Sequence, residues 1–194
     1  MPPADEAERE IDAWRPKWLA SSHRATYRLT RFVLLRFLGL IYTVAFAVAS
    51  NQLVPLVGKD GLLPAAPFMA RVKEALGGEA WLRIPNLFLL GASDAALAGV
   101  SFTGLALALL VLAGFANSIV LSLLWLFYLS IIRAGQLFWG YGWESLLLEV
   151  GFLAIFLAPP LDPRPFPKKE SPPRIIVWLL WWVLFRLMLG AGLI

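Results

Sequence analysis

Long apolar segments, separated by short polar or proline-rich stretches, dominate the hydrophobic pattern of this chain. Each apolar segment predicts a helix that crosses a membrane, because about 20 helical residues, at about 1.5 Å each, span the hydrocarbon layer. The pattern predicts an all-α fold: a polytopic transmembrane helix bundle of about five spans. We expect the spans at about residues 32–57, 97–113, 118–133, 144–158 and 175–194.

The segment between the first two predicted spans, residues 58–85, has a different pattern. It opens with the turn-forming run Gly-Lys-Asp-Gly-Leu-Leu-Pro at residues 58–64. Apolar side chains then recur at helical spacing from Pro67 to Leu76, with Phe68, Val72, Ala75 and Leu76 on one face. This spacing predicts an amphipathic helix at the membrane interface that caps the bundle.

Two polar regions border the spans. Residues 1–31 predict a polar cytoplasmic tail, with a short interfacial helix over residues 12–19. The tail mixes acidic and basic residues and is followed by a long apolar segment, which differs from a signal peptide. The proline-rich stretch 159–173 predicts an extended linker. Residues 32–194 then form one transmembrane bundle, and we expect a C-terminal extramembrane domain to follow it, because the last span has no polar flank.

Composition supports a lipid bilayer as the main partner of this chain. Of its 194 residues, 59% are hydrophobic and 15% charged, whereas soluble domains carry about 25% charged residues. The net charge of +4 comes from basic residues at the edges of the apolar segments, which argues for membrane topology and against nucleic-acid binding. The chain contains no cysteine, so disulfides and cysteine-bound metals within it are excluded.

The distribution of basic residues predicts the orientation, because cytoplasmic loops carry an excess of Lys and Arg. An N-terminus in the cytoplasm puts ten on that side: Arg9, Arg15, Lys17, Arg24, Arg28, Arg31, Arg164, Lys168, Lys169 and Arg174. The opposite side then has five: Lys59, Arg71, Lys73, Arg83 and Arg133. We predict an integral membrane protein with a cytoplasmic N-terminus, in the plasma membrane of a bacterium or the endoplasmic reticulum membrane of a eukaryote.

Three ionisable residues within or beside the spans are candidate functional residues: Glu144, Glu149 and Arg186. A charge at the centre of a membrane helix costs about 2.5–3.5 kcal/mol on insertion scales. We therefore predict that Arg186 pairs with Glu149 inside the bundle. The sequence leaves open whether this pair locks two helices together or lines a substrate or partner site. Glu144 and Glu149 lie five residues apart, about 140° around a helix, so they occupy different faces.

Aromatic residues flank the fourth predicted span. Trp139, Tyr141 and Trp143 predict a belt at the outer interface that anchors the bundle. Trp139 and Trp143 are also candidates for partner binding. The sequence shows no catalytic grouping, metal-ligand cluster, phosphate loop or dinucleotide fingerprint. We therefore assign no catalytic residue, metal or cofactor.

Three stretches of the sequence together point to a family. The first is the run at residues 58–64. The others are WGYGWESLLLEVGFLAIFLAP at residues 139–159 and WLLWWVLFRLMLGAGLI at residues 178–194. In this order they resemble the lipase maturation factor family, over residues 32–194. The first stretch is also similar to the wider group of membrane proteins related to vitamin-K-dependent carboxylase.

This resemblance implies a multi-span protein that resides in the endoplasmic reticulum in animals. There it helps secreted lipases to fold and assemble into active homodimers. The resemblance also implies a large non-membrane region after the fifth span, and structural importance for Trp143, Glu144, Glu149 and Arg186. Two alternatives stay open: a carboxylase-like membrane enzyme with Glu149 and Arg186 lining a polar cavity, and a transporter fragment. The client and the oligomeric state are left open by the sequence.

Overall fold

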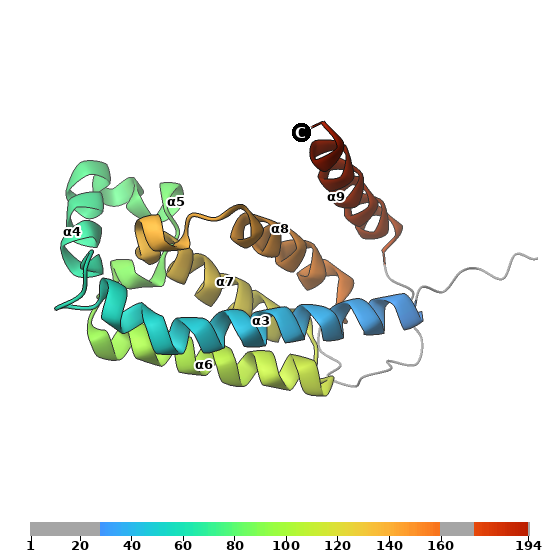
Figure 1. The fold of residues 1–194 in the computed structure, drawn as a ribbon, viewed down its shortest axis with the longest axis horizontal. Helices are drawn as coiled ribbons and strands as arrows, with labels where there is room; N and C mark the ends of the chain where they lie inside the picture. Colours follow the sequence, from blue (N-terminus) through green and yellow to red (C-terminus); the bar gives the residue numbers. More distant parts are fainter. Residues whose placement is uncertain (1–27, 160–172, 194) are drawn as a thin grey trace, which may run out of the picture.

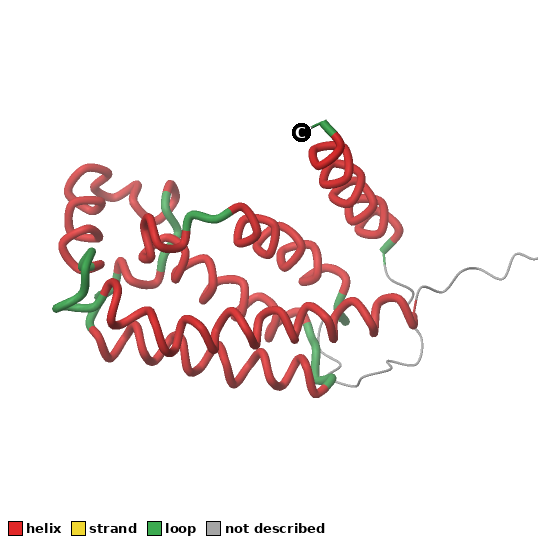
Figure 2. The backbone as a smooth tube through the Cα atoms, viewed as in Figure 1, coloured by secondary structure: helices red, strands yellow, loops and turns green. Residues whose placement is uncertain are grey.

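A computed structural model describes residues 28–159 and 173–193, and all regular structure in these two ranges is helical. Figures 1 and 2 show long helices lying side by side, with the last long helix set off from them at an angle and short helices gathered at one end. The long helices are α3 (Arg28–Val57), α6 (Asp94–Ala113), α7 (Ser118–Gly135), α8 (Gly142–Leu157) and α9 (Arg174–Gly192). The short ones are α4 (Ala65–Leu76), η1 (Gly77–Glu79), α5 (Ala80–Arg83), η2 (Leu87–Leu89) and η3 (Gln136–Trp139).

Helices α3 and α6 form the most extensive helix pair of the bundle, and small residues bring them together. A Cβ atom added at Gly39 would lie 2.7 Å from the backbone nitrogen of Leu112, and one added at Gly104 would overlap the ring of Phe46. Ala108, in the same helix as Gly104, is fully buried. Small residues allow such close approach between membrane helices, where packing rather than the hydrophobic effect drives association.

Within residues 28–159 and 173–193, four helical segments are long and apolar enough to cross a membrane: Leu29–Val57, Asp94–Ala113, Ser118–Trp139 and Arg174–Gly192. Their exposed positions carry large apolar side chains such as Phe37 and Phe102, which only lipid can cover favourably. Helix α8, the fourth predicted span, lies beside α7 but has 16 residues, or about 24 Å. The all-α polytopic bundle predicted from the sequence is therefore confirmed.

One end of the bundle, which we name the outer end after the topology predicted from the sequence, is closed by the segment between α3 and α6. Its helix α4 matches the predicted amphipathic helix, and Met69 on this helix is buried. Long-range hydrogen bonds hold the segment in place. They run from the Lys59 backbone N–H to Asp94 Oδ1 (2.8 Å), from Gln136 Nε2 to the Leu63 carbonyl (3.1 Å), and from the Leu87 backbone N–H to Ser130 Oγ (3.0 Å).

At the opposite end, hereafter the inner end, an arginine caps a helix. The sequence suggests that Arg36 extends toward the lipid headgroups. Instead its guanidinium donates a hydrogen bond to the Leu112 carbonyl at the end of α6 and lies over the Phe32 ring, 4.7 Å from the centroid. The guanidinium also packs on Gly114, whose φ of 111° ends α6. A cation at a helix C-terminus satisfies a free carbonyl and complements the helix dipole.

The structure extends the start of the first predicted span and matches its end. Helix α3 begins at Arg28, so the last four residues of the predicted tail are helical, and it continues through Pro55 to Val57. Pro55 ends the helix only after two more residues, because proline removes its own N–H but not the hydrogen bonds of neighbouring residues. The rest of the tail, its predicted helix at 12–19, and linker residues 160–172 lie outside the described residues.

Candidate functional site

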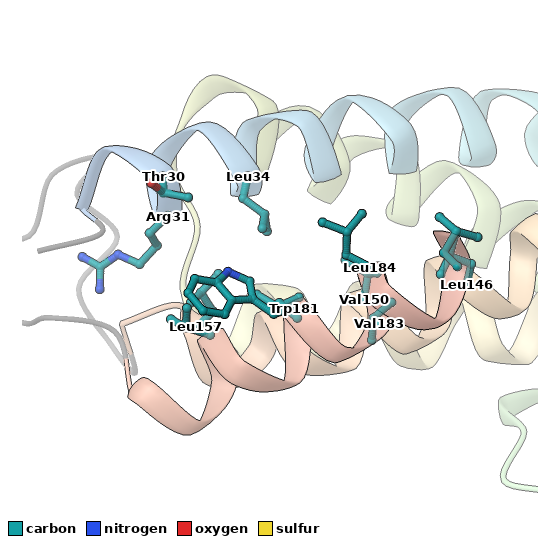
Figure 3. A pocket seen from close by; sticks show the side chains of 12 residues that line it. Thr30, Arg31, Leu34, Leu146, Val150, Leu157, Trp181, Val183 and Leu184 are labelled. Atoms are coloured by element: carbon teal, nitrogen blue, oxygen red, sulfur yellow. The ribbon is translucent and has the colours of Figure 1, made fainter. Parts of the chain in front are cut away.

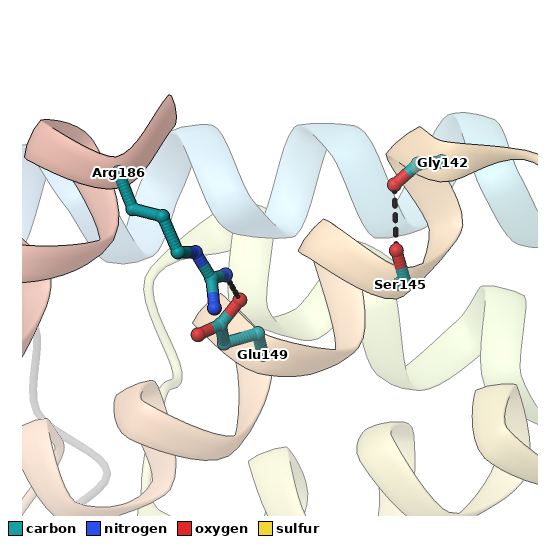
Figure 4. Close-up of polar contacts among 4 residues, drawn as sticks. All are labelled: Gly142, Ser145, Glu149 and Arg186. Atoms are coloured by element: carbon teal, nitrogen blue, oxygen red, sulfur yellow. Dashed lines mark hydrogen bonds and ion pairs between the residues drawn. The ribbon is translucent and has the colours of Figure 1, made fainter. Parts of the chain in front are cut away.

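The predicted ion pair is present between α8 and α9. Figure 4 shows the Arg186 side chain reaching from α9 to Glu149 on α8, where its Nη2 bonds Oε2 of the carboxylate. The side chains are 56% and 35% exposed, respectively, so the pair lies at the edge of the bundle rather than in its core. In a bilayer both charges would be costly without a partner. Each of the two charges therefore has the other as its partner of opposite sign.

Apart from this pair, α9 packs only loosely on the bundle. Among its described residues only Ile176 and Val183 are buried. A groove of about 360 Å³ lies between α9, α8 and the inner half of α3. Figure 3 shows Leu34, Val150 and Trp181 on its walls and Arg31 at one end. Ten of its twelve lining residues are aliphatic or aromatic, so the groove offers few polar groups for chemistry.

Glu144 occupies the opposite environment from Glu149. It lies in the first turn of α8, at the outer end, and is only 3% exposed. One carboxylate oxygen accepts a hydrogen bond from the Tyr141 backbone N–H (3.1 Å), and the Glu144 N–H donates to the Tyr141 carbonyl (3.2 Å). Nearby, Ser145 Oγ donates to the Gly142 carbonyl (Figure 4). The first two of these bonds satisfy backbone N–H groups at the start of α8, where the helix itself offers them no acceptor.

A second cavity, of about 380 Å³, surrounds this carboxylate, and we call it the outer pocket. It is formed by the outer half of α3, by Tyr128 of α7, and by η3 and the start of α8. Its lining residues are Val44, Ala45, Val48, Gln52, Leu56, Tyr128, Phe138, Trp139, Tyr141, Trp143 and Glu144. The outer pocket therefore combines one buried carboxylate with five aromatic side chains.

The three aromatic residues of the predicted belt have different surroundings. Tyr141 and Trp143 are exposed, as interfacial anchors would be, but Trp139 is only 5% exposed. Trp139 therefore does not contribute an exposed side chain to the predicted belt. Its ring packs on Gly135, where an added Cβ would lie 2.6 Å from it, and it lines the outer pocket. The missing side chain at Gly135 lets η3 turn the indole inward.

Sequence reasoning missed two residues near this pocket, Tyr42 and Tyr128. Both are fully buried, and their hydroxyl groups have no hydrogen-bond partner. Their rings meet edge to face with centroids 5.8 Å apart, and the ring of Tyr128 lies 6.5 Å from that of Trp143. A buried hydroxyl usually finds a partner. In the sequence they resemble ordinary aromatic residues of a span, and only their missing partners single them out.

The described residues contain no group of three or more His, Asp or Glu side chains that could hold a metal.

The comparison with known families matches nearly the whole described chain. The family model named lipase maturation factor transmembrane domain matches residues 29–194. The chain belongs to the lipase maturation factor family. All five long helices, the Glu149–Arg186 pair and the outer pocket lie within this matched domain.

Curated relatives place the domain in a larger context. The chain is 43% identical to mouse lipase maturation factor 1 over 183 residues, which cover 90% of this chain and 32% of the mouse protein. It is 39% identical to the human factor 1 over the same shares. Its identity to lipase maturation factor 2 of Xenopus tropicalis is 35%, over 86% of this chain and 25% of that protein. The chain thus spans about a third of the length of the factor 1 relatives. No solved structure matches it.

Proposed function

We propose that this chain is the membrane domain of a maturation factor that assists the folding and assembly of secreted lipases. The observation that carries the proposal is the match of the family model over residues 29–194. The similarity to proteins named lipase maturation factor in mouse, human and Xenopus points the same way. The match covers about a third of the length of the factor 1 relatives, so the proposal concerns the contribution of the transmembrane domain to maturation.

We place the client-facing surface at the outer end of the bundle. The segment between α3 and α6 forms a cap there, and several of its apolar side chains are exposed. Leu62 is 73% exposed and Leu82 is 86% exposed, and Trp81 beside Leu82 is 45% exposed. Exposed apolar residues next to charged ones suit a surface that meets a partly folded protein. This orientation requires the N-terminus in the cytoplasm, which the ten-to-five distribution of basic residues supports.

The Glu149–Arg186 pair has a structural role in this proposal, as a lock between α8 and α9. The groove beside it is lined mainly by aliphatic and aromatic side chains, and neither member of the pair lines that groove. An enzyme site at this position calls for a polar pocket around both charges. The apolar surroundings favour a scaffold.

The proposed orientation predicts which introduced cysteines a labelling reagent can reach. Because the chain contains no cysteine of its own, only the introduced residue reacts. Leu62→Cys lies at the outer end, and Phe115→Cys lies in the turn between α6 and α7 at the inner end. In sealed vesicles whose outer surface is the cytoplasmic side, a membrane-impermeant maleimide should label the Phe115→Cys variant. The Leu62→Cys variant should be labelled only after detergent is added. The reverse pattern would mean that the N-terminus is not cytoplasmic.

The proposed function predicts that this domain can replace its counterpart in a relative. In a chimera, residues 29–194 replace the matching segment of mouse lipase maturation factor 1. Cells that lack their own factor should secrete active lipase when they express the chimera. Secreted lipase activity, normalised to the amount of chimera in the membrane fraction, is the measurement.

A matched control is a chimera that carries Leu62→Asp and Leu82→Asp at the outer end. Both side chains are exposed, so these changes should leave the membrane level unchanged but lower the lipase activity. If the parent chimera reaches the membrane in normal amounts and gives no active lipase, the proposed function of this domain is wrong.

A further inference from the structure

The outer pocket is lined by a buried carboxyl group that has no cationic partner among the described residues. Glu144 is 3% exposed, and its only polar side-chain contact among the described residues is the Tyr141 backbone N–H. The ion pairs in the described part of the chain join Arg83 to Glu79 and Arg186 to Glu149, and neither includes Glu144. A buried carboxylate without a cation is strongly unfavourable. A positively charged ligand would offset this cost.

The walls of the pocket suit an organic cation better than a metal ion. Tyr128, Phe138, Trp139, Tyr141 and Trp143 line it beside the carboxylate. Aromatic faces attract alkylammonium groups through their quadrupole, and cages of aromatic residues recognise choline-type ligands. A metal ion requires several oxygen or nitrogen ligands, whereas the only carboxylate lining this pocket is that of Glu144.

A second buried polar side chain belongs to the wall of this pocket. Tyr128 lines the pocket and is 0% exposed, and its hydroxyl has no hydrogen-bond partner among the described residues. The polar groups in this part of the bundle are thus less fully satisfied than buried groups usually are.

We propose that the outer pocket binds the ammonium headgroup, choline or ethanolamine, of a membrane phospholipid. The pocket volume of about 380 Å³ falls within the usual range for small-molecule sites, about 300–1,000 Å³.

The side on which the pocket opens favours a lipid over a soluble cation. Val44 and Val48 of α3 line it and are 58% and 43% exposed. They continue the exposed apolar stripe of α3 that includes Phe37 and Ile41, and this stripe faces the hydrocarbon when α3 spans a bilayer. A lipid can therefore reach the pocket sideways, with its chains against this stripe. The proposal is independent of the lipase client.

The test compares two isosteric changes at the outer end of the bundle. Glu144→Gln removes the carboxylate but keeps an oxygen that accepts the Tyr141 N–H, so the start of α8 should stay folded. Glu74→Gln is the matched control, because this carboxylate is exposed on α4 and lies outside the pocket. Each protein is purified in a mild detergent with an equimolar mixture of phosphatidylcholine and phosphatidylglycerol. The lipids retained are then counted by native mass spectrometry.

We expect the unmodified protein and Glu74→Gln to retain phosphatidylcholine in preference to phosphatidylglycerol. In Glu144→Gln this preference should fall by about tenfold or more, because the ammonium group loses its ionic partner in the pocket. An unchanged preference in Glu144→Gln, or an equal loss in both variants, would overturn the proposal.

A competition experiment keeps the proposal testable even if Glu144→Gln fails to fold. Tetramethylammonium chloride should displace phosphatidylcholine from the unmodified protein, whereas sodium chloride at the same ionic strength should not. Equal displacement by the two salts would overturn the proposal. So would a Glu144→Gln variant that retains lipid normally but no longer co-purifies with a secreted lipase, because the pocket would then hold a basic side chain of the client.

Discussion

Arg186→Glu is expected to lower the stability of the bundle by about 3 kcal/mol, the scale of an unpaired charge within a membrane helix. The change places a second carboxylate against Glu149, so two negative charges meet between α8 and α9. Since only Ile176 and Val183 of α9 are otherwise buried, little else holds this helix in place. Thermal unfolding of the purified protein in detergent measures the loss.

Reversal of both charges provides the control for this prediction. The double variant Glu149→Arg with Arg186→Glu restores opposite charges at the same two positions, and it should recover most of the lost stability. A double-mutant cycle isolates the pair energy from other effects of each change. If the two single reversals cost stability and the double reversal costs their sum, the two side chains do not interact in the folded protein.

Gly104→Leu is the second change with a large expected effect, because it acts at a tight contact between α6 and α3. An added Cβ at this position would overlap the Phe46 ring, lying 2.6 Å from its Cζ atom. Phe46 is fully buried, so its ring cannot move aside without disturbing the core. Overpacking of this kind costs about 1–3 kcal/mol, occasionally more. We expect a lower unfolding temperature in detergent and less folded protein in the membrane fraction.

Gly99 supplies a matched control for this prediction. It lies in the same helix, and nothing lies within 4 Å of a Cβ atom placed there. Gly99→Leu should therefore leave the stability unchanged or raise it slightly, since leucine favours helix more than glycine does. Equal losses in Gly99→Leu and Gly104→Leu would show that the effect comes from the helix itself and not from the contact with α3.

The spans could be predicted because lipid imposes a simple rule on the sequence. A backbone in hydrocarbon must satisfy its hydrogen bonds internally, and helices about 20 residues long do so. The apolar runs therefore give the positions of α3, α6, α7 and α9, with small differences at their ends. The same rule explains why the Glu149–Arg186 pair was predictable: charges are so costly in this solvent that two opposite ones within spans are expected to meet.

The outer pocket could not be predicted, because it depends on how each helix is rotated about its axis. Trp139 and Trp143 are the same residue type and lie four positions apart in the sequence, yet Trp139 is buried and Trp143 is exposed. The difference arises from Gly135, which admits the Trp139 ring. Arg36 likewise caps the C-terminal end of α6 only because that end lies beside it in the folded bundle. Neither contact has a local sequence signal.

The sequence by itself determined that the chain lies in a membrane, that it folds into helices, which family it belongs to, and that Glu149 pairs with Arg186. These follow from the cost of exposing polar groups to lipid, which depends on residue type and spacing alone. Only the tertiary structure decided that Glu144 is enclosed by aromatic rings from α7, η3 and α8 beside the outer half of α3. That arrangement depends on close contacts between residues nearly a hundred positions apart in the sequence. Such contacts fix how each helix is rotated about its axis, and they depend on packing geometry rather than on hydropathy.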